Sequence, residues 1–219
     1  MTFKAPDSLA EQIAQHLGEQ IIRGEMKPAE RIQEQKITQL LNVSRGSVRE
    51  ALLILERRHL VAILPRRGAH VSELSPHKVQ SLCTLMCELY ILLGLAFANR
   101  WKTQADLAPF LEIQQRLIAA NERGDIHAFI EGSFAVMRAV FPYADNPYLQ
   151  ETIENLQPAL MRIYYIALDQ RLSEMPAFLE SFAALLQAVI KRSPAQIRLV
   201  LSAYTQRNQN LVLAALAKG

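Results

Sequence analysis

The sequence is poor in cysteine and glycine and has no long apolar run, and each shortage excludes a class of protein. Two cysteines in 219 residues cannot form a disulfide framework. Eight glycines argue against loops that hold phosphates, and no P-loop, GxGxxG, GxSxG or HExxH motif is present. The longest apolar run, residues 89–98, is about half of the roughly 20 residues that span a bilayer. We therefore expect a protein that is neither an enzyme nor bound to a membrane.

Charge is close to balanced over the whole chain but is unevenly distributed along it. The net charge is +3, and residues 75–219 carry 13 basic and 12 acidic groups. Residues 43–71 contain only two acidic residues against six basic ones: Arg45, Arg49, Arg57, Arg58, Arg66 and Arg67. A basic patch in one short region favours a polyanionic partner there. The first twelve residues contain no apolar stretch, so we expect no secretory signal and a cytoplasmic protein.

The pattern of residues 1–74 predicts three helices followed by a β-hairpin. Ser8 is a good N-cap for a first helix with an apolar repeat, and a second helix fits residues 33–41. Ser44 can cap the third helix by accepting a hydrogen bond from the backbone N–H of Ser47. Two β-rich runs, residues 60–64 and 69–72, then flank a Pro-Arg-Arg-Gly turn. This order predicts a winged helix-turn-helix with two cations at the tip of its hairpin.

The third helix carries two arginines, and no carboxylate lies at a helical spacing from which it could neutralise both. Arg45 and Arg49 lie one turn apart near its N-terminus, where a cation opposes the helix dipole. A negatively charged partner would offset that cost, although a solvated surface is the alternative. The apolar stripe beside them is predicted to face the core and consists of Val48, Ala51, Leu52 and Leu55.

The segments "IIRGEMKPAERI", "NVSR", "VREAL", "LERRHLV" and "RRGAHV" resemble the DNA-binding domain of GntR-family bacterial regulators. Ala29 and Ser47 depart from the usual glycine and proline of that family. The resemblance implies that Arg45 and Arg49 bind operator DNA and that the wing tip contributes. An arginine stands at the position of Gln35 in the acyl-CoA-responsive relatives. The predicted DNA-binding residues are Arg45, Arg49, Ser44, Ser47, Gln35, Arg66, Arg67, Gly68 and His70.

Beyond a linker, "SELSPH", the sequence predicts a second domain made only of helices, so that the fold is mostly α. The predicted domains are residues 1–74 and 75–219. About six helices fit the pattern, and they predict an antiparallel bundle with a core large enough to enclose a cavity. Their expected ranges are 76–101, 104–123, 125–141, 147–170, 175–191 and 194–217. Cys83 and Cys87 lie on one face of the first of these helices, in apolar surroundings typical of core residues.

This second part resembles the effector domain called FCD in the FadR-like branch of the family. Many members bind a divalent metal there through one aspartate and three histidines, but Ser133, Met137, Phe182 and Tyr204 stand at those positions. Tyr90 and Gly94 replace a common arginine and glutamate. We therefore expect no metal and no cofactor, and an effector held by shape, stacking and hydroxyl groups. The predicted effector-binding residues are Tyr90, Ser133, Met137, Arg138, Arg162, Phe182 and Tyr204.

These features together predict a homodimeric, sequence-specific DNA-binding regulator, expected to be a repressor. A two-fold protein implies a pseudo-palindromic operator. A small organic effector bound in the helical domain would control it. Two alternatives remain open: a helical domain that serves only as a dimerisation scaffold, and a metal-dependent sensor or enzyme joined to a DNA-binding domain.

Overall fold

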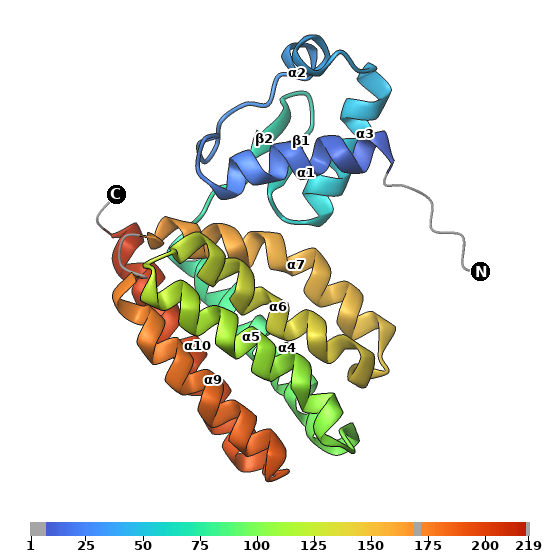
Figure 1. Cartoon of the computed structure of the whole chain (residues 1–219). Helices are drawn as coiled ribbons and strands as arrows, with labels where there is room; N and C mark the ends of the chain where they lie inside the picture. Colours follow the sequence, from blue (N-terminus) through green and yellow to red (C-terminus); the bar gives the residue numbers. More distant parts are fainter. Residues whose placement is uncertain (1–7, 169–171, 218–219) are drawn as a thin grey trace, which may run out of the picture. The chain divides into compact units, whose positions relative to one another are not determined.

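The computed structural model describes residues 8–168 and 172–217 (Figure 1), and the chain divides into two compact units. The first unit contains the residues up to Ser75 together with Asn155–Tyr165, and the second contains Pro76–Glu154 and the residues from Ile166 onward. Residues 155–165 thus group with the first unit, whereas the sequence analysis assigned them to the second domain. The division into independent domains at residue 74 stays a prediction.

The first unit contains the three helices and the hairpin that the sequence predicted. Helix α1 spans Leu9–Ile22, α2 spans Glu34–Leu41 and α3 spans Arg45–Arg57. Strand β1 (Val61–Leu64) pairs antiparallel with β2 (Gly68–Val71), with Val61 opposite Val71 and Leu64 opposite Gly68. Strand β1 begins one residue later than the predicted run. Strand β2 begins one residue earlier than predicted, because Gly68 already pairs with Leu64. The winged helix-turn-helix is confirmed.

The core of the first unit is built by the apolar stripe predicted for α3. Helix α3 packs against α1, α2 and β1. The four stripe residues are at most 2% exposed and lie in one cluster with α1 and the strands: Val48, Ala51, Leu52 and Leu55. The placement of Arg45 and Arg49 outside this cluster follows from the same helical period.

The segment before α2 adds a third extended stretch to the hairpin, which the sequence did not predict. The backbone N–H of Ala29 donates to the carbonyl oxygen of Val71 at 3.0 Å, and that of Ile32 donates to Ala69 at 2.8 Å. Val71 in turn donates to the carbonyl of Glu30 at 2.9 Å. These bonds satisfy backbone groups along the free edge of β2. Ala29 adopts a φ of 63°, in the left-handed region that favours glycine.

Six long helices follow the hairpin in the described part of the chain, as the sequence predicted, and all of them lie in the second unit except for residues 155–165 of α7, which group with the first unit. They are α4 (Pro76–Arg100), α5 (Gln104–Glu122), α6 (Ile126–Ala144), α7 (Pro147–Ile166), α9 (Met175–Ile190) and α10 (Pro194–Leu216). A short 3₁₀ helix, η1 (Leu172–Glu174), precedes α9. The predicted end of α6 at residue 141 was wrong, because the helix continues through Pro142. Helix α7 ends at Ile166, and the predicted extension to residue 170 falls partly on residues 169–171, outside the described part of the chain.

Helix α4 is long and largely apolar, and it contributes eight buried residues to the core of the second unit. By length and composition it could cross a membrane, but it packs against α6, α9 and α10 within this unit. Cys83 and Cys87 are 2% and 8% exposed, which confirms them as core residues. Gly94 lies where a Cβ atom would approach Cγ2 of Ile197 to 3.0 Å, so glycine allows the close crossing of α4 and α10.

A polar contact joins α5 to α6 near the start of α5. The Asp106 carboxylate accepts hydrogen bonds from the backbone N–H of Lys102 and Thr103, each at 2.9 Å. It also accepts one from the Tyr143 hydroxyl at 2.9 Å. These bonds favour the ionised form, and they lower the pKa of Asp106 to about 2.

Candidate functional site

The start of α3 is fixed by two serine side chains. Ser44 is the N-cap, and its Oγ accepts a hydrogen bond from the backbone N–H of Ser47 at 3.1 Å, as the sequence predicted. The two hydroxyl oxygens are 2.9 Å apart and share a further hydrogen bond. Both hydroxyls therefore hold the first turn in place, which orients the side chains that follow.

Arg45 and Arg49 both have exposed side chains on α3. Arg45 is the first residue of the helix and, among the residues that the structure describes, has no ion-pair partner. Arg49 has a partner that sequence spacing did not reveal, since its Nε lies 3.0 Å from Oε2 of Glu34 on α2. The Arg49 side chain remains 71% exposed, so solvent screens this pair and its net strength is small.

The remaining predicted DNA-binding residues lie on α2 and in the hairpin. Gln35 has an exposed position on α2, next in sequence to the partner of Arg49. Arg66 and Arg67 are exposed in the turn between the strands, and Arg66 and Gly68 have φ values of 61° and 80°. His70 is half-buried on β2, with Nδ1 3.2 Å from the carbonyl oxygen of Gly68. The turn therefore presents its two guanidinium groups to solvent.

Aromatic side chains gather inside the second unit, and we call them the interior aromatic cluster. Phe178 lies at its centre, with ring centroids 5.4 Å from Tyr204, 5.3 Å from Phe129 and 6.3 Å from Phe182. The first two contacts are edge-to-face, a favourable geometry for aromatic pairs. Burial raises the pKa of the Tyr90 hydroxyl well above its ordinary value, and nearby Tyr204 adds to this rise. The cluster comprises Tyr90, Phe129, Phe178, Phe182 and Tyr204.

The structure brings together three of the seven predicted effector-binding residues, namely Tyr90, Phe182 and Tyr204. Ser133 and Met137 are half-buried on α6, and the Ser133 hydroxyl donates to the carbonyl of Ile130 at 2.7 Å.

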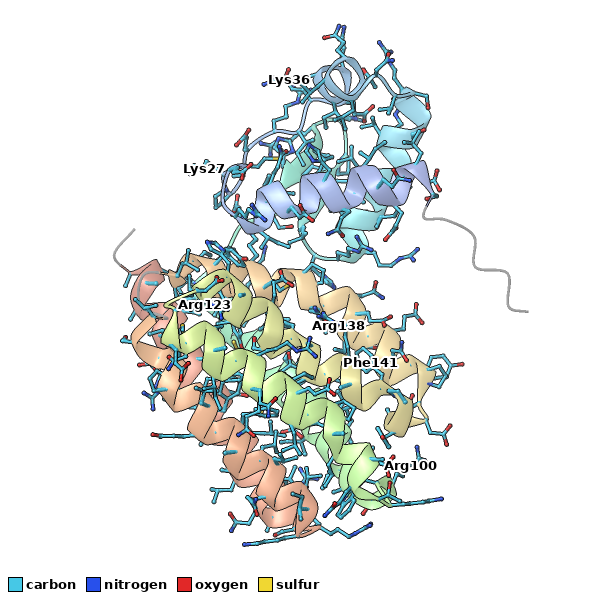
Figure 2. All side chains as sticks on the ribbon, viewed as in Figure 1. Lys27, Lys36, Arg100, Arg123, Arg138 and Phe141 are labelled. Carbon is cyan, nitrogen blue, oxygen red and sulfur yellow. The ribbon has the colours of Figure 1, made fainter. Side chains whose placement is uncertain are left out.

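The two arginines predicted to bind an effector do not belong to the interior aromatic cluster. The side chain of Arg138 on α6 is exposed (Figure 2). Arg162 is 3% exposed and belongs to the first unit, where its guanidinium donates to the carbonyl of Ser72 at 2.7 Å. Burial lowers the pKa of Arg162 to about 10. This bond to the chain's own backbone does not support a role for Arg162 in holding an effector.

The residues at the family's metal-ligand positions do not fit a divalent metal. A serine hydroxyl and a tyrosine hydroxyl are poor ligands, a thioether suits soft ions only, and phenylalanine offers no donor. The Ser133 hydroxyl is already bonded to the backbone. Within the described ranges, no three His, Cys, Asp or Glu side chains lie close enough to share a metal ion.

Sequence reasoning missed Glu34, Phe129 and Phe178. Glu34 is 15 positions from Arg49, so their contact depends on how α2 packs against α3. Phe129 lies on α6, and no local pattern relates it to α9. Phe178 could have been found, because it stands four residues before Phe182 and therefore shares its helical face.

Two family models match this chain, one for each part of the structure described above. The model described as bacterial regulatory proteins, gntR family, matches residues 9–71. The model described as FCD domain matches residues 90–207, which is more than half of the chain.

Curated relatives and solved structures match over most of the chain. The HTH-type transcriptional regulator McbR of Escherichia coli (strain K12) is 27% identical over 204 residues, which cover 92% of this chain and 91% of McbR. The gluconate operon transcriptional repressor of Bacillus subtilis (strain 168) is 28% identical, covering 74% of this chain and 66% of the repressor. The structure of E. coli McbR/YncC has a TM-score of 0.80 at 24% identity, covering 95% of this chain and 99% of that one, and supports the fold. The two curated relatives are transcriptional regulators, not enzymes.

Proposed function

Because this chain belongs to the GntR family of bacterial regulatory proteins and carries an FCD domain, we propose that it represses transcription by binding a pseudo-palindromic operator as a homodimer. The observation that carries the proposal is the exposed Arg45 at the capped start of α3, which has no ion-pair partner among residues 8–168 and 172–217. A cation there opposes the helix dipole, and DNA phosphates or guanine acceptors would offset that cost. The chain is a transcriptional regulator of this family, and we propose that it acts in the cytoplasm.

In the proposed complex, α3 enters the major groove with its first turn toward the base edges. Arg45 donates to the O6 and N7 of a guanine or to a phosphate, and Arg49 does the same after leaving Glu34. The exposed Arg66 and Arg67 of the turn between the strands contact phosphates beside the groove. Gln35 and His70 supply further contacts at the margin.

Selection from random DNA with the purified full chain tests this function. We expect enrichment of one short motif, repeated with two-fold symmetry, at physiological salt. A chain that retains only sequence-independent DNA, or none, would refute the proposal. The identical selection with the Arg45→Ala, Arg49→Ala double variant is the control, and it should enrich no motif.

For the second unit we propose an organic effector bound at the interior aromatic cluster without metal. Aromatic faces and the hydroxyls of Tyr90 and Tyr204 favour a ligand with a flat or apolar body and a few polar groups. Such a ligand alters DNA binding only if its affinity differs between two arrangements of the protein. The poor fit of the residues at the family's metal-ligand positions supports a site without metal.

A second candidate is a helical unit that serves only as a scaffold, and the close ring contacts of Phe178 favour it. The centroids of its ring and those of Phe129 and Tyr204 are 5.3 and 5.4 Å apart, which is the direct edge-to-face contact typical of a packed core. A metabolite screen for loss of DNA binding separates the two candidates. A compound whose effect on DNA binding disappears in Tyr204→Phe or Phe182→Ala supports an effector site at the interior aromatic cluster. A compound that acts equally on the wild type and on both variants would show that its binding site lies outside the cluster. Stoichiometric zinc, nickel or manganese in purified protein would contradict the absence of metal.

A further inference from the structure

The chain leaves the winged helix-turn-helix through Ser72, the first residue after β2. The backbone N–H of Ser72 donates to the carbonyl oxygen of Leu60 at 2.9 Å, which ties it to the residue just before β1. The carbonyl oxygen of Ser72 accepts a hydrogen bond from Nη1 of Arg162 at 2.7 Å. Both backbone polar groups of Ser72 are therefore held, one by the winged helix itself and the other by α7.

Arg162 reaches Ser72 from the part of α7 that groups with the first unit, although the two residues are 90 positions apart in the sequence. Residues 155–165 of α7 belong to the first unit, and the rest of this helix belongs to the second. The chain therefore passes between the units along α7 as well as through the segment that follows Ser72. The bond from Arg162 ties these two connections together within the first unit.

The guanidinium group of Arg162 is costly to bury, and stability alone does not account for it. Arg162 is 3% exposed, and among residues 8–168 and 172–217 no carboxylate forms an ion pair with it. Burial lowers the pKa of Arg162 to about 10, because the charged form loses its hydration. Replacing buried charges by apolar side chains of similar volume is often neutral or stabilising. The contact with Ser72 therefore explains an arginine at this position better than packing does.

This contact is suited to fixing the path of the chain as it leaves the hairpin. A hydrogen bond from a charged donor is strong and directional. The proposed homodimer must place two α3 helices on two half-sites at once, so the path by which each chain leaves its winged helix limits the distance between them. We propose that Arg162 is a positioning residue, which sets the spacing of half-sites that the homodimer accepts by holding the carbonyl of Ser72.

The inference deepens the proposed function, on which it rests for the two half-sites of the operator. It gives Arg162 no contact with DNA, so the loss of Arg162 changes the preference for one spacing and leaves the affinity for a single half-site intact. A direct contact with DNA would lower the affinity for a single half-site. A purely structural role would lower the stability of the folded chain.

The full chain and two matched variants test these alternatives. Arg162→Met removes the donor and the charge but keeps an unbranched side chain in the buried position. The control is Arg116→Met, the same replacement at an arginine that is 72% exposed on α5. Fluorescence anisotropy measures each protein on the motif that the wild type selects, on duplexes whose half-sites are moved by one or two base pairs, and on a duplex with a single half-site.

The wild type and Arg116→Met should share a strong preference for the selected spacing. In Arg162→Met this preference should fall roughly 10-fold, as expected for the loss of one hydrogen bond from a charged donor, while the affinity for the single half-site should equal that of the wild type. An unchanged preference, or an equal loss of affinity for every duplex, would overturn the inference. Urea denaturation of Arg162→Met should give a midpoint at or above that of the wild type, and a much lower midpoint would also overturn it.

Hydrogen exchange gives a second measurement that needs no DNA. Peptides that cover residues 68–75 should exchange faster in Arg162→Met than in the wild type or in Arg116→Met, and equal exchange in all three would show that Arg162 does not hold this segment. A wild type that selects a two-fold motif but accepts every spacing equally would refute only the role of Arg162. A wild type that selects no motif would refute the proposed function and, with it, the role of Arg162 in spacing.

Discussion

The two units of this protein place the side chains that we propose to be functional in opposite ways. In the first unit, Arg45, Arg49, Arg66 and Arg67 are exposed to solvent on a helix and a turn close together in the sequence. In the second, the interior aromatic cluster is assembled from α4, α6, α9 and α10, and its members are partly or fully buried. The comparison teaches that a surface site can be altered without unfolding its unit, whereas an interior site shares its residues with the core.

The largest effect on stability is expected for a substitution in the core of the first unit. Leu55 is fully buried in α3, so Leu55→Ala should lower the free energy of unfolding by about 2–5 kcal/mol. Leu53, two residues earlier, is 58% exposed, and Leu53→Ala should change stability by less than about 0.5 kcal/mol. Urea denaturation measures both, and equal losses would show that the assigned faces of α3 are wrong.

Substitutions of the two members of the ion pair between Arg49 on α3 and Glu34 on α2 should change the affinity for DNA in opposite directions. Arg49→Ala should weaken binding by about 1–3 kcal/mol, because a contact to base or phosphate is lost. Glu34→Ala should strengthen it by up to about 1 kcal/mol, because Arg49 no longer leaves a partner to bind DNA. Fluorescence anisotropy with the selected motif measures both changes. Weakening by both substitutions to the same extent would mean that the pair acts as a structural unit.

Much of the first unit could be predicted because its determinants are local. The Ser44 cap, the core stripe of α3 and the hairpin each depend on residues a few positions apart, and all three were confirmed. The pairing of Arg49 with Glu34 and the extended stretch at residues 29–32 depend on packing between distant segments, which no local pattern contains.

In the second unit the helices were predictable and the composition of the site was not. Proline usually ends a helix, but Pro142 lies within α6, so the predicted end at residue 141 was three residues early. Phe129 joins Phe178 only because α6 and α9 lie together in the folded unit. Arg162 was predicted to hold an effector from its residue type, but it donates to the carbonyl of Ser72.

Backbone strain at one residue of the first unit offers a stabilising substitution. Ala29 has a φ of 63°, a conformation that costs an alanine more than a glycine. Ala29→Gly should therefore raise the free energy of unfolding by about 0.5–1 kcal/mol, after the greater freedom of glycine in the unfolded chain is subtracted. Thermal unfolding measures the change. A loss of stability in Ala29→Gly would contradict the left-handed conformation.

The smallest effect is expected in the second unit and depends on pH. The pKa of Asp106 is lowered from 3.8 to about 2, so its ionised form stabilises the fold above about pH 3.8. That contribution is lost as the pH falls through 2. Asp106→Asn should lower stability at neutral pH and flatten the decline between pH 4 and 2. Unfolding at a series of acid pH values measures this slope, and identical slopes for the two proteins would exclude the hydrogen bonds as its cause.

The most direct test of the central claim is the affinity of Arg45→Ala for the selected DNA motif and for a scrambled duplex. The matched control is Arg116→Ala, which removes an exposed arginine from α5. We predict that Arg45→Ala loses about 1–3 kcal/mol on the motif, with less discrimination against the scrambled duplex, and that the control matches the wild type. Unchanged affinity and discrimination in Arg45→Ala would contradict the assignment of α3 as the DNA-binding helix.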